Sequence, residues 1–480
     1  MKPIILLLLP LQLLAQKSNQ SELDKFIKST TEQVKAAGAS VLVAQQGKII
    51  LNKGYGFAHM GFRIPATPQT KYFIVGPETI VLATAIMQQV EKGNLSLDDE
   101  IQKHLPDFPL QGKKVTIRHL ITCTSGIPDY HYLGDSFTGH ELPKTQDEVI
   151  NLFAGKPFLI EPGTKYDHSI SNFALLTAIL EKFTNQHYQD YLQANFINPL
   201  SLQETEYLEQ DKLIPNFAQG YKFVDTSFFP VTESLFTYDY SHRLVSTTGD
   251  LYKLWDGLKK NKVITATSFA LMTSREEANK NNSGNYGYGI FVYKLENFER
   301  IHASGSLRGY SSSLYDIPEK DITIIVLSNT DGAQEAANIG SRIARKMLGL
   351  PPLPFNSKKS IADLPVSNSE SSSISGTYAI NRKLNSGGAL TNNTYKRTVR
   401  VFVENDRLML QMFGRLPQLL LKQEDSSFRV KALPTTIIKF LKENDKTILS
   451  MISPEYNDTG TMIGNADAKT FHGAAFENLK

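Results

Sequence analysis

Hydrophobic and polar residues follow different patterns in the two parts of this chain. From about residue 22 to residue 350, segments with helical periodicity alternate with short apolar runs such as residues 40–43 and 322–327. Short apolar runs that are bounded by turn residues predict strands. Because these strands alternate with helices, we expect an α/β or α+β body over residues 22–350.

The pattern changes after LPPLPFNSKKS, a segment that contains Pro and Ser. The later segments VRVFVENDRLMLQMF, QLLLKQEDSSFRVKAL and TIIKFLKENDKTILSMI contain short apolar stretches separated by Asn, Asp and Ser. This spacing predicts an antiparallel meander of short strands. We therefore expect a linker at residues 351–373 and a separate small β-domain at residues 374–480.

One helix of the body is predicted to be buried on nearly every side. Proline suits the first helical position, where its missing N–H would be unpaired in any case, so we expect this helix to begin at Pro77. Residues 80–87 are almost all apolar, which is typical of a central helix. Gly93 follows at the place where a helix end favours glycine.

A short apolar run lies at the amino terminus, in the sequence MKPIILLLLPLQLLAQ. One Lys precedes the run at residues 4–14, and Ala15 is a small residue at a plausible cleavage point. These features predict a signal peptide over residues 1–16, and therefore a secreted or periplasmic protein, with an uncleaved anchor as the alternative. No later run is long and apolar enough to cross a bilayer, so we expect no transmembrane segment in the mature chain.

The composition supports two packed cores and does not suggest a nucleic-acid partner. Of 480 residues, 41% are hydrophobic and 10% are aromatic, which is ample for two cores. The 51 basic and 48 acidic residues are interspersed, and the net charge of +3 predicts no patch for a polyanion. Cys123 is the only cysteine, so no intramolecular disulfide can form, and its apolar neighbours predict a buried, unreactive thiol.

Several long segments occur in a recognisable order along residues 25–345. They include VTIRHLITCTSGIPDY, EPGTKYDHSISNFALLTAILEKF, NYGYGIFVY and HASGSLRGYSSSLYDIPEKDITIIVLSNTD. In this order the chain resembles the β-lactamase-related serine hydrolases, which include class C β-lactamases, penicillin-binding proteins, D-alanyl-D-alanine carboxypeptidases and related esterases. The resemblance implies an α+β fold of the α/β-sandwich type, in which helices flank an antiparallel sheet. The C-terminal β-domain is similar to the lipocalin-like barrels often appended in this family.

In that family the central helix opens with F-x-x-G-S-x-x-K. The Ser is the nucleophile, and the Lys on the same helix face helps to deprotonate it. In this chain Phe73 and Gly76 set the frame. Pro77 then stands at the serine position and Ile80 at the lysine position, so both reactive groups are missing.

The second family motif is Y-x-N, which follows P-G-T-K. Its Tyr serves as acid and base, and its Asn holds the substrate and the Lys. In EPGTKYDHSISN the frame places His168 at the tyrosine position and Ile170 at the asparagine position.

The third family motif is [KH]-x-G on a strand, where the cation faces the carboxylate of the substrate. Counting back from GYSS, the chain has Ala303, Ser304 and Gly305 here, so the glycine remains and the charge does not. His302 is adjacent, but neighbouring strand residues point to opposite faces. We therefore expect His302 to be packed away from the cleft.

The resemblance also implies an oxyanion hole made by the N–H of the nucleophile residue and an N–H near Ser306. Proline has no N–H, so Pro77 removes one donor together with the hydroxyl. Losing one such donor costs about 100 to 1,000-fold in rate, and deleting a serine nucleophile costs on the order of a million-fold. We therefore expect a non-catalytic binding or regulatory protein.

Two other interpretations remain open. An active site rebuilt from Thr79 and His168, which follow Glu78 and Asp167, would keep the chain a hydrolase. Alternatively, the chain is an adaptor that acts through its β-domain. Fold analogy alone does not decide between them.

The former catalytic cleft is the default ligand site. We expect it to bind a cell-wall peptide, a small lipid-like molecule or a partner protein, without a cofactor. The candidate cleft residues are Glu78, Thr79, Tyr130, His168, Ser304, Gly305 and Ser306. A loop with His131, Asp135 and His140 lacks the ligand spacing of a zinc site, so no metal is expected.

Overall fold

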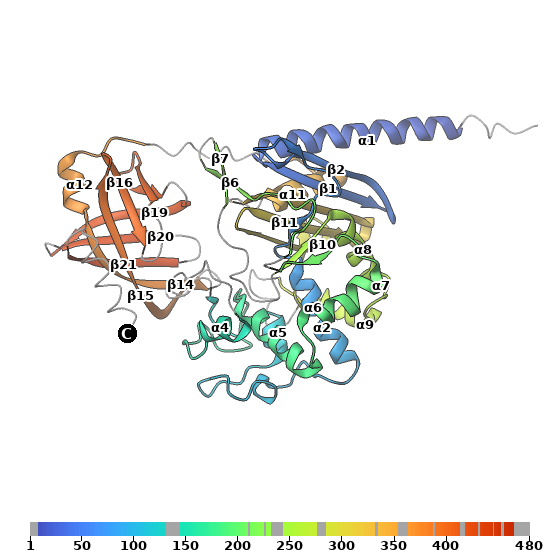
Figure 1. Cartoon of the computed structure of the whole chain (residues 1–480), viewed down its shortest axis with the longest axis horizontal. Coiled ribbons are helices and arrows are strands. Elements are labelled where there is room, and N and C mark those ends of the chain that lie inside the picture. Colours follow the sequence, from blue (N-terminus) through green and yellow to red (C-terminus); the bar gives the residue numbers. More distant parts are fainter. Residues whose placement is uncertain are drawn as a thin grey trace, which may run out of the picture.

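The structure is a computed structural model in which an α+β body and a β-barrel can be followed (Figure 1). The residues that it describes are 8–130, 145–209, 212–224, 227–231, 243–275, 285–331, 335–353, 363–386, 389–412, 418–430, 433–444, 446–452 and 456–464. The polar loop that contains His131, Asp135 and His140 lies outside these residues. None of the described helices is both long enough and apolar enough to span a bilayer.

A seven-stranded antiparallel sheet forms the centre of the body, with the strand order β3-β2-β1-β12-β11-β10-β9. Its strands are β1 (Gly38–Gln45), β2 (Lys48–His59), β3 (Ile64–Pro65), β9 (Phe291–Leu295), β10 (Phe298–Leu307), β11 (Tyr310–Ile317) and β12 (Ile322–Ser328). β1 and β12 pair at the centre, with Val41 opposite Val326. Both strands are buried on both faces, which is why their sequences are continuously apolar instead of alternating.

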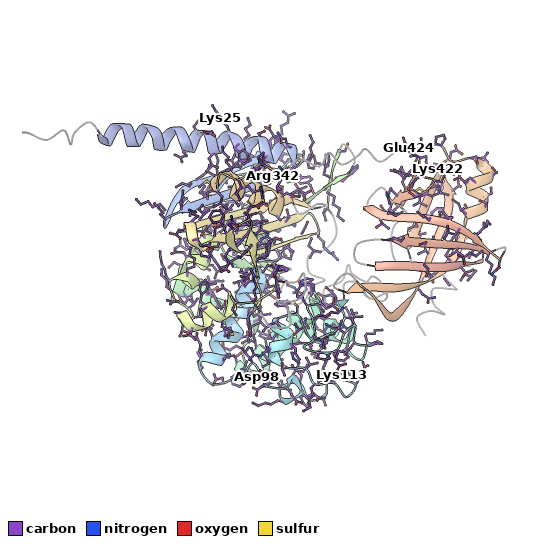
Figure 2. All side chains as sticks on the ribbon, turned by 180° about the vertical axis from the view of Figure 1, so that it is seen from behind. Lys25, Asp98, Lys113, Arg342, Lys422 and Glu424 are labelled. Atoms are coloured by element: carbon purple, nitrogen blue, oxygen red, sulfur yellow. The ribbon has the colours of Figure 1, made fainter. Side chains whose placement is uncertain are left out.

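Helices cover both faces of this sheet. On one face, α1 (Leu8–Gln33) and α11 (Glu335–Met347) pack in one core with Val41 and Val43. Figure 2 shows Lys25 on α1 and Arg342 on α11 on this side of the sheet. On the other face, Leu42 and Ala44 join a larger core that includes helix α2 (Glu78–Glu91). The alternating side chains of β1 therefore supply two separate cores.

Helix α2 has the central position that its sequence predicts. Twelve of its residues are buried, from Glu78 to Gln89. Pro77 directly precedes it with a helical φ of −62°, and Gly93 follows its last turn with a φ of +72°. The proline start and the glycine end both agree with the expected helix bounds.

The other elements of the body surround α2. Two small sheets have the orders β13-β6-β7 and β4-β8-β5. Their strands are β4 (Tyr72–Phe73), β5 (Glu206–Tyr207), β6 (Tyr221–Val224), β7 (Ser227–Pro230), β8 (Leu244–Ser246) and β13 (Thr330–Asp331). The remaining helices are α3 (Ile117–Ile121), α4 (Gln146–Asn151), α5 (Ser171–Thr184), α6 (Tyr188–Leu192), α7 (Asn198–Leu200), α8 (Thr248–Lys259) and α9 (Ala266–Met272), with short 3₁₀ turns at Ile101–Lys103 and Pro318–Lys320 and a π turn at Gln193–Ile197.

The C-terminal part is a closed eight-stranded antiparallel barrel, which confirms the predicted meander and barrel. Its strands are β14 (Gly376–Ser386), β15 (Ala389–Glu404), β16 (Arg407–Met412), β17 (Gln418–Lys422), β18 (Phe428–Val430), β19 (Leu433–Glu443), β20 (Lys446–Ile452) and β21 (Tyr456–Gly464). β14 pairs with both β15 and β21, which closes the barrel. Closure leaves no strand edge exposed to a second chain.

A short helix from the expected linker packs on this barrel. In α12 (Asn368–Ile374), Ile374 belongs to the barrel core, and its carbonyl accepts a 2.6 Å hydrogen bond from the Tyr378 hydroxyl. Glu370 of the same helix forms a 2.6 Å ion pair with Lys422 on β17. The chain therefore joins the barrel several residues before β14 begins.

Candidate ligand site at the start of helix α2

The first turn of α2 lies directly against the end of strand β10. Gly76 has a φ of +95°, and a Cβ on it would lie 2.3 Å from the carbonyl carbon of Ser304. A Cβ on Gly305 would lie 3.0 Å from the backbone nitrogen of Gly76. The fold thus brings the first and third motif positions together, and only glycine fits at either contact.

The two positions at which the family carries its nucleophile and its lysine are closed to solvent. Pro77 is buried. Ile80 is 2% exposed and belongs to the large core of the body. An ammonium group at position 80 would therefore have to replace an apolar side chain inside a packed core.

Thr79 is held by two backbone carbonyls and also hydrogen-bonds the Tyr286 phenol. Its hydroxyl lies 2.7 Å from the carbonyl oxygen of Gly76 and 2.8 Å from that of Gly289. The single hydroxyl proton can be donated to only one acceptor at a time, and both of these acceptors are carbonyls. This arrangement fixes Thr79 in the wall between α2 and residues 285–290 without activating its oxygen.

The second motif is the most accessible part of the site. His168 is exposed, and its Nδ1 lies 3.3 Å from the Tyr166 hydroxyl. The Tyr166 ring is 5.2 Å from the ring of Tyr286. Burial raises the pKa of the Tyr286 phenol well above its usual value, and Cys123 and Tyr166 raise it further. Burial also raises the pKa of the Tyr166 phenol, so both phenols stay protonated at neutral pH.

Tyr166 and Tyr286 were not predicted as site residues. Together with Phe291 they form an aromatic cluster, with ring centroids 4.7 Å apart for Tyr286 and Phe291. Tyr166 precedes α5, whereas Tyr286 comes from the segment before β9. No local sequence pattern relates residues so far apart, although both lie in segments that the family resemblance covers.

At the third motif, Ala303 and its neighbour His302 lie on opposite faces of β10, as the alternation of side chains along a strand predicts. Ala303 is 3% exposed and belongs to the core around α2. His302 packs on the opposite face, where its ring stacks on Tyr315 with centroids 4.3 Å apart and its Nδ1 lies 2.9 Å from the Tyr293 hydroxyl. Burial, followed by the neighbouring Arg300 cation, lowers the pKa of His302 to about 3. His302 does not replace the missing cation.

Cys123 is buried near the same site. Its backbone has a φ of +51°, and it lies after helix α3 in the core of the body. Burial raises the pKa of its thiol to about 12, although a backbone N–H at Ser169 and the Asn172 side chain oppose the shift. The thiol therefore stays protonated and cannot act as a nucleophile.

The predicted cleft residues fall into two groups. Glu78, Thr79 and Tyr130 are 2%, 7% and 1% exposed, and the Tyr130 ring stacks on Phe153. These three side chains belong to the packed interior, and their assignment to the cleft stays a prediction. Those that a ligand can reach are His168, which is exposed, and Ser304, Gly305 and Ser306, which are half-buried.

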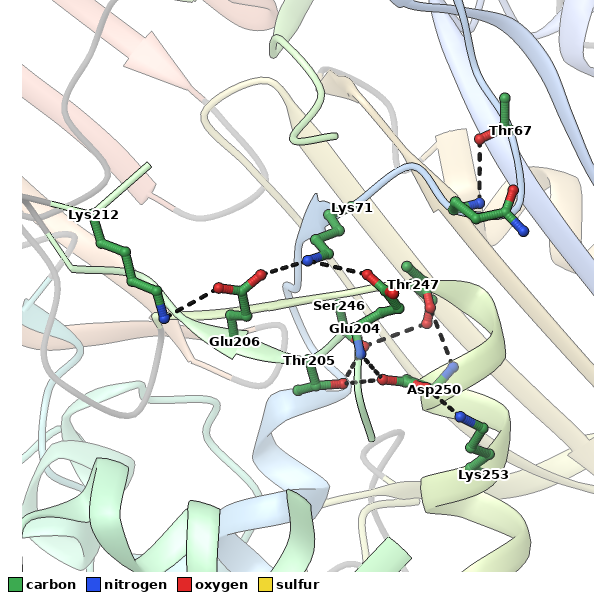
Figure 3. Close-up of polar contacts among 11 residues, drawn as sticks. Thr67, Lys71, Glu204, Thr205, Glu206, Lys212, Ser246, Thr247, Asp250 and Lys253 are labelled. Carbon is green, nitrogen blue, oxygen red and sulfur yellow. Dashed lines mark hydrogen bonds and ion pairs between the residues drawn. The ribbon is translucent and has the colours of Figure 1, made fainter. Parts of the chain in front are cut away.

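A partly buried ion-pair network positions the segment that leads into α2 (Figure 3). Lys71, whose side chain is 5% exposed, contacts the carboxylates of Glu204 and Glu206. Glu206 also pairs with Lys212 at 3.1 Å. Because β4 begins at the residue after Lys71, the network ties β4 to the segment that carries β5 and so holds the entry to α2.

No metal site is found in the described part of the chain. Among these residues, no group of three or more His, Cys, Asp or Glu side chains is arranged to hold a metal ion.

This chain is similar to known proteins over most of the body. A family model described as Beta-lactamase matches residues 23–346. Protein flp of Staphylococcus aureus (strain N315) is 26% identical over 318 residues, which are 65% of this chain and 63% of that protein. The chain therefore spans less than two thirds of the length of this relative. Penicillin-binding protein 4* of Bacillus subtilis (strain 168) is 26% identical over 419 residues, which are 83% of this chain and 89% of that protein.

A solved structure extends the likeness in fold to nearly the whole chain. The octameric penicillin-binding protein homologue from Pyrococcus abyssi superposes with a TM-score of 0.62 at 24% identity. The superposition covers 92% of this chain and 99% of that chain. At this identity the likeness concerns the fold and not the activity.

Proposed function

The chain belongs to the Beta-lactamase family of serine hydrolase-like proteins, and we propose that it is a non-catalytic member that binds a ligand. The single observation that carries the proposal is Pro77 at the amino-terminal end of α2. A proline there has neither the hydroxyl that attacks a carbonyl carbon nor the N–H that stabilises the resulting oxyanion. Both missing groups act in the same step, so acyl transfer by the family route is lost.

Two candidate nucleophiles in the described part of the body are not activated. Thr79 lies within hydrogen-bonding distance of two backbone carbonyls, and the Cys123 thiol has a pKa raised to about 12 by burial. A catalytic hydroxyl or thiol needs an adjacent general base or a lowered pKa, and neither group shows such activation in these contacts. These contacts argue against the alternative of a rebuilt hydrolase.

The accessible residues support binding of a polar ligand at the end of β10. His168, which lies next to the Tyr166 hydroxyl, and the half-buried residues 304–306 offer donors and acceptors for such a ligand. One relative is named a penicillin-binding protein, so we propose a cell-wall peptide as the ligand class, with a small molecule or a partner protein as alternatives. The apolar amino-terminal run supports a secreted or periplasmic location, where cell-wall peptides occur.

Two measurements test this proposal. The purified chain is incubated with a fluorescent penicillin and with a fluorophosphonate, and its intact mass is recorded. We expect no covalent adduct. A stoichiometric mass shift that Thr79→Ala abolishes would replace the proposal with the rebuilt-hydrolase alternative.

Binding is measured by calorimetry with a cell-wall stem peptide. Ser306→Trp, which fills the half-buried end of β10, should weaken binding, whereas Ser29→Trp on the exposed part of α1 should not. If stem peptide binds equally to both variants, the ligand site lies elsewhere, as in an adaptor that uses its barrel.

A further inference from the structure

One corner of the body exposes apolar side chains far from the start of α2. The turn between β2 and β3 presents Phe62 at 77% exposure and Ile64 at 51% exposure. Nearby, Phe57 on β2 is 39% exposed and Phe229 on β7 is 50% exposed. Monomeric soluble proteins seldom keep a contiguous apolar patch of this kind without a binding role. We call Phe57, Phe62 and Ile64 the aromatic corner.

Specific contacts hold the β2–β3 turn beside the β6–β7 hairpin. Phe57, Met60 and Phe228 line one groove of about 540 Å³ with the end of α1. The Met60 N–H donates a 2.8 Å hydrogen bond to the Tyr221 hydroxyl, which fixes the β2–β3 turn beside β6. Figure 1 shows the β6–β7 hairpin beside the carboxyl-terminal end of α1. The turn and the hairpin therefore form a single surface.

The turn is held in shape although its side chains are exposed. The ring of Phe62 packs on that of His59 with centroids 4.4 Å apart, and the Phe62 N–H donates to His59 Nδ1 at 3.2 Å. Arg63 follows with a φ of +55°, so Phe62 and Ile64 project from a defined turn. Because this apolar tip is already ordered, it loses little further conformational entropy when it inserts into a binding partner.

The charge around the aromatic corner is positive. Lys28, Lys35 and Arg63 are exposed; Lys28 lies close enough to Asp24 to help lower the pKa of that carboxyl, whereas neither Lys35 nor Arg63 forms a salt bridge with a described residue. Lys53, in the same groove, is neutralised by Asp24 at 2.7 Å. Among the described residues, the lining of this groove holds two cations, Lys28 and Lys53, and one acid, Glu32, and Arg63 adds an exposed cation next to Phe62.

We propose that the aromatic corner binds the surface of an anionic phospholipid bilayer. Aromatic and aliphatic tips that are flanked by Lys and Arg insert below the headgroups while the cations contact the lipid phosphates. A protruding tip suits a deformable lipid surface better than the flat, complementary face of a second copy. The inference is independent of the ligand at the start of α2.

The test is co-sedimentation of the full chain with vesicles. Phosphatidylglycerol mixed with phosphatidylcholine is compared with phosphatidylcholine alone, and we expect binding only to the anionic mixture. The double change Phe62→Ser and Ile64→Ser should lower the partition coefficient about tenfold or more. Arg63→Gln should lower it about fivefold.

Leu213→Ser is the matched control because Leu213 is 94% exposed outside the aromatic corner. It should bind vesicles like the unchanged chain, and the thermal melting of all variants should be unaltered. Equal binding by the double variant and the unchanged chain would refute the proposal. A sedimentation velocity run without lipid provides the second check. An oligomer that the double variant dissociates would assign the corner to a second copy of the chain instead.

Discussion

Gly76 and Gly305 approach each other so closely that neither position has room for a side chain. A Cβ on Gly76 would lie 2.6 Å from the backbone nitrogen of Gly305, and real Cβ atoms do not come this close to a backbone atom. The contact holds the amino-terminal end of α2 against β10. It is therefore the structural basis of the candidate site.

We expect Gly76→Ala to lower the free energy of unfolding by about 3 kcal/mol or more, because it adds an overpacked contact to a backbone with positive φ. Gly93→Ala is the matched control, since Gly93 has a φ of +72° but no atom within 4 Å of the place that a Cβ would take. Gly93→Ala should lower the free energy of unfolding by only about 1 kcal/mol. Denaturant unfolding measures both, and equal losses would show that the backbone contact at Gly76 is not tight.

Ile80→Lys should destabilise the protein by about 3 kcal/mol or more, because an ammonium group without partners is costly to bury. Ile80 is 2% exposed, whereas Ile49 on β2 is 51% exposed. Ile49→Lys should therefore change stability by no more than about 0.5 kcal/mol. If Ile80→Lys proved equally harmless, position 80 would be open to water, and a polar ligand or unrecognised chemistry would be favoured instead.

Adding Pro77→Ser, His168→Tyr and Ile170→Asn to Ile80→Lys should recover part of the lost stability. The four side chains would form one hydrogen-bonded network, so their effects should not add. Denaturant unfolding of the single variants and the quadruple variant measures this coupling. Additive losses would mean that the four positions do not meet around residue 80.

His302 should make stability depend on pH. Its pKa is about 3 in the folded protein, below the usual 6.5, because burial and Arg300 oppose its protonation. Between these values the unfolded chain binds more protons, so the contribution of His302 to stability is lost as pH falls from about 6.5 towards 3. His302→Phe should reduce this acid-induced loss by up to about 5 kcal/mol.

Urea unfolding of His302→Phe across this pH range measures the difference in slope. His187→Gln is the control, because the His187 side chain is 87% exposed. Identical slopes for His302→Phe and the unchanged chain would mean that His302 takes up its proton in the folded state.

Lys71→Met should lower the free energy of unfolding by about 2 kcal/mol or more. Glu206 would then be left partly buried, and of its two lysine partners only Lys212 would remain. Lys53→Met removes a more exposed ion pair with Asp24 and should cost at most about 1 kcal/mol. Thermal melting ranks the two variants. If Lys53→Met lowered the melting temperature more than Lys71→Met, the Lys71 network would not be what holds β4 in place.

The boundary between the body and the barrel also yields a test. We predict that a fragment of residues 363–480 folds alone, because α12 packs on a closed barrel. A fragment that starts at residue 376 lacks Ile374 and should be less stable by about 3 kcal/mol. Circular dichroism melts compare the two. A longer fragment that stays unfolded would show that the barrel depends on the body.

The sequence by itself determined the features that depend on local order. Pro77 and Gly93 marked the ends of α2, and apolar runs marked β1 and β12, because capping and periodicity act between residues close in the chain. The groups that acyl transfer needs were also absent at Pro77 and Ile80 whatever the fold, since no packing can supply a hydroxyl or an ammonium there.

Only the tertiary structure decided which distant residues meet. It paired Val41 with Val326, placed Tyr286 beside Tyr166, and packed Ile374 into the barrel. It also buried Glu78 and Tyr130, which the sequence had suggested as cleft residues. Periodicity shows which face of an element is apolar, but the partner of that face depends on the summed packing of segments hundreds of residues apart.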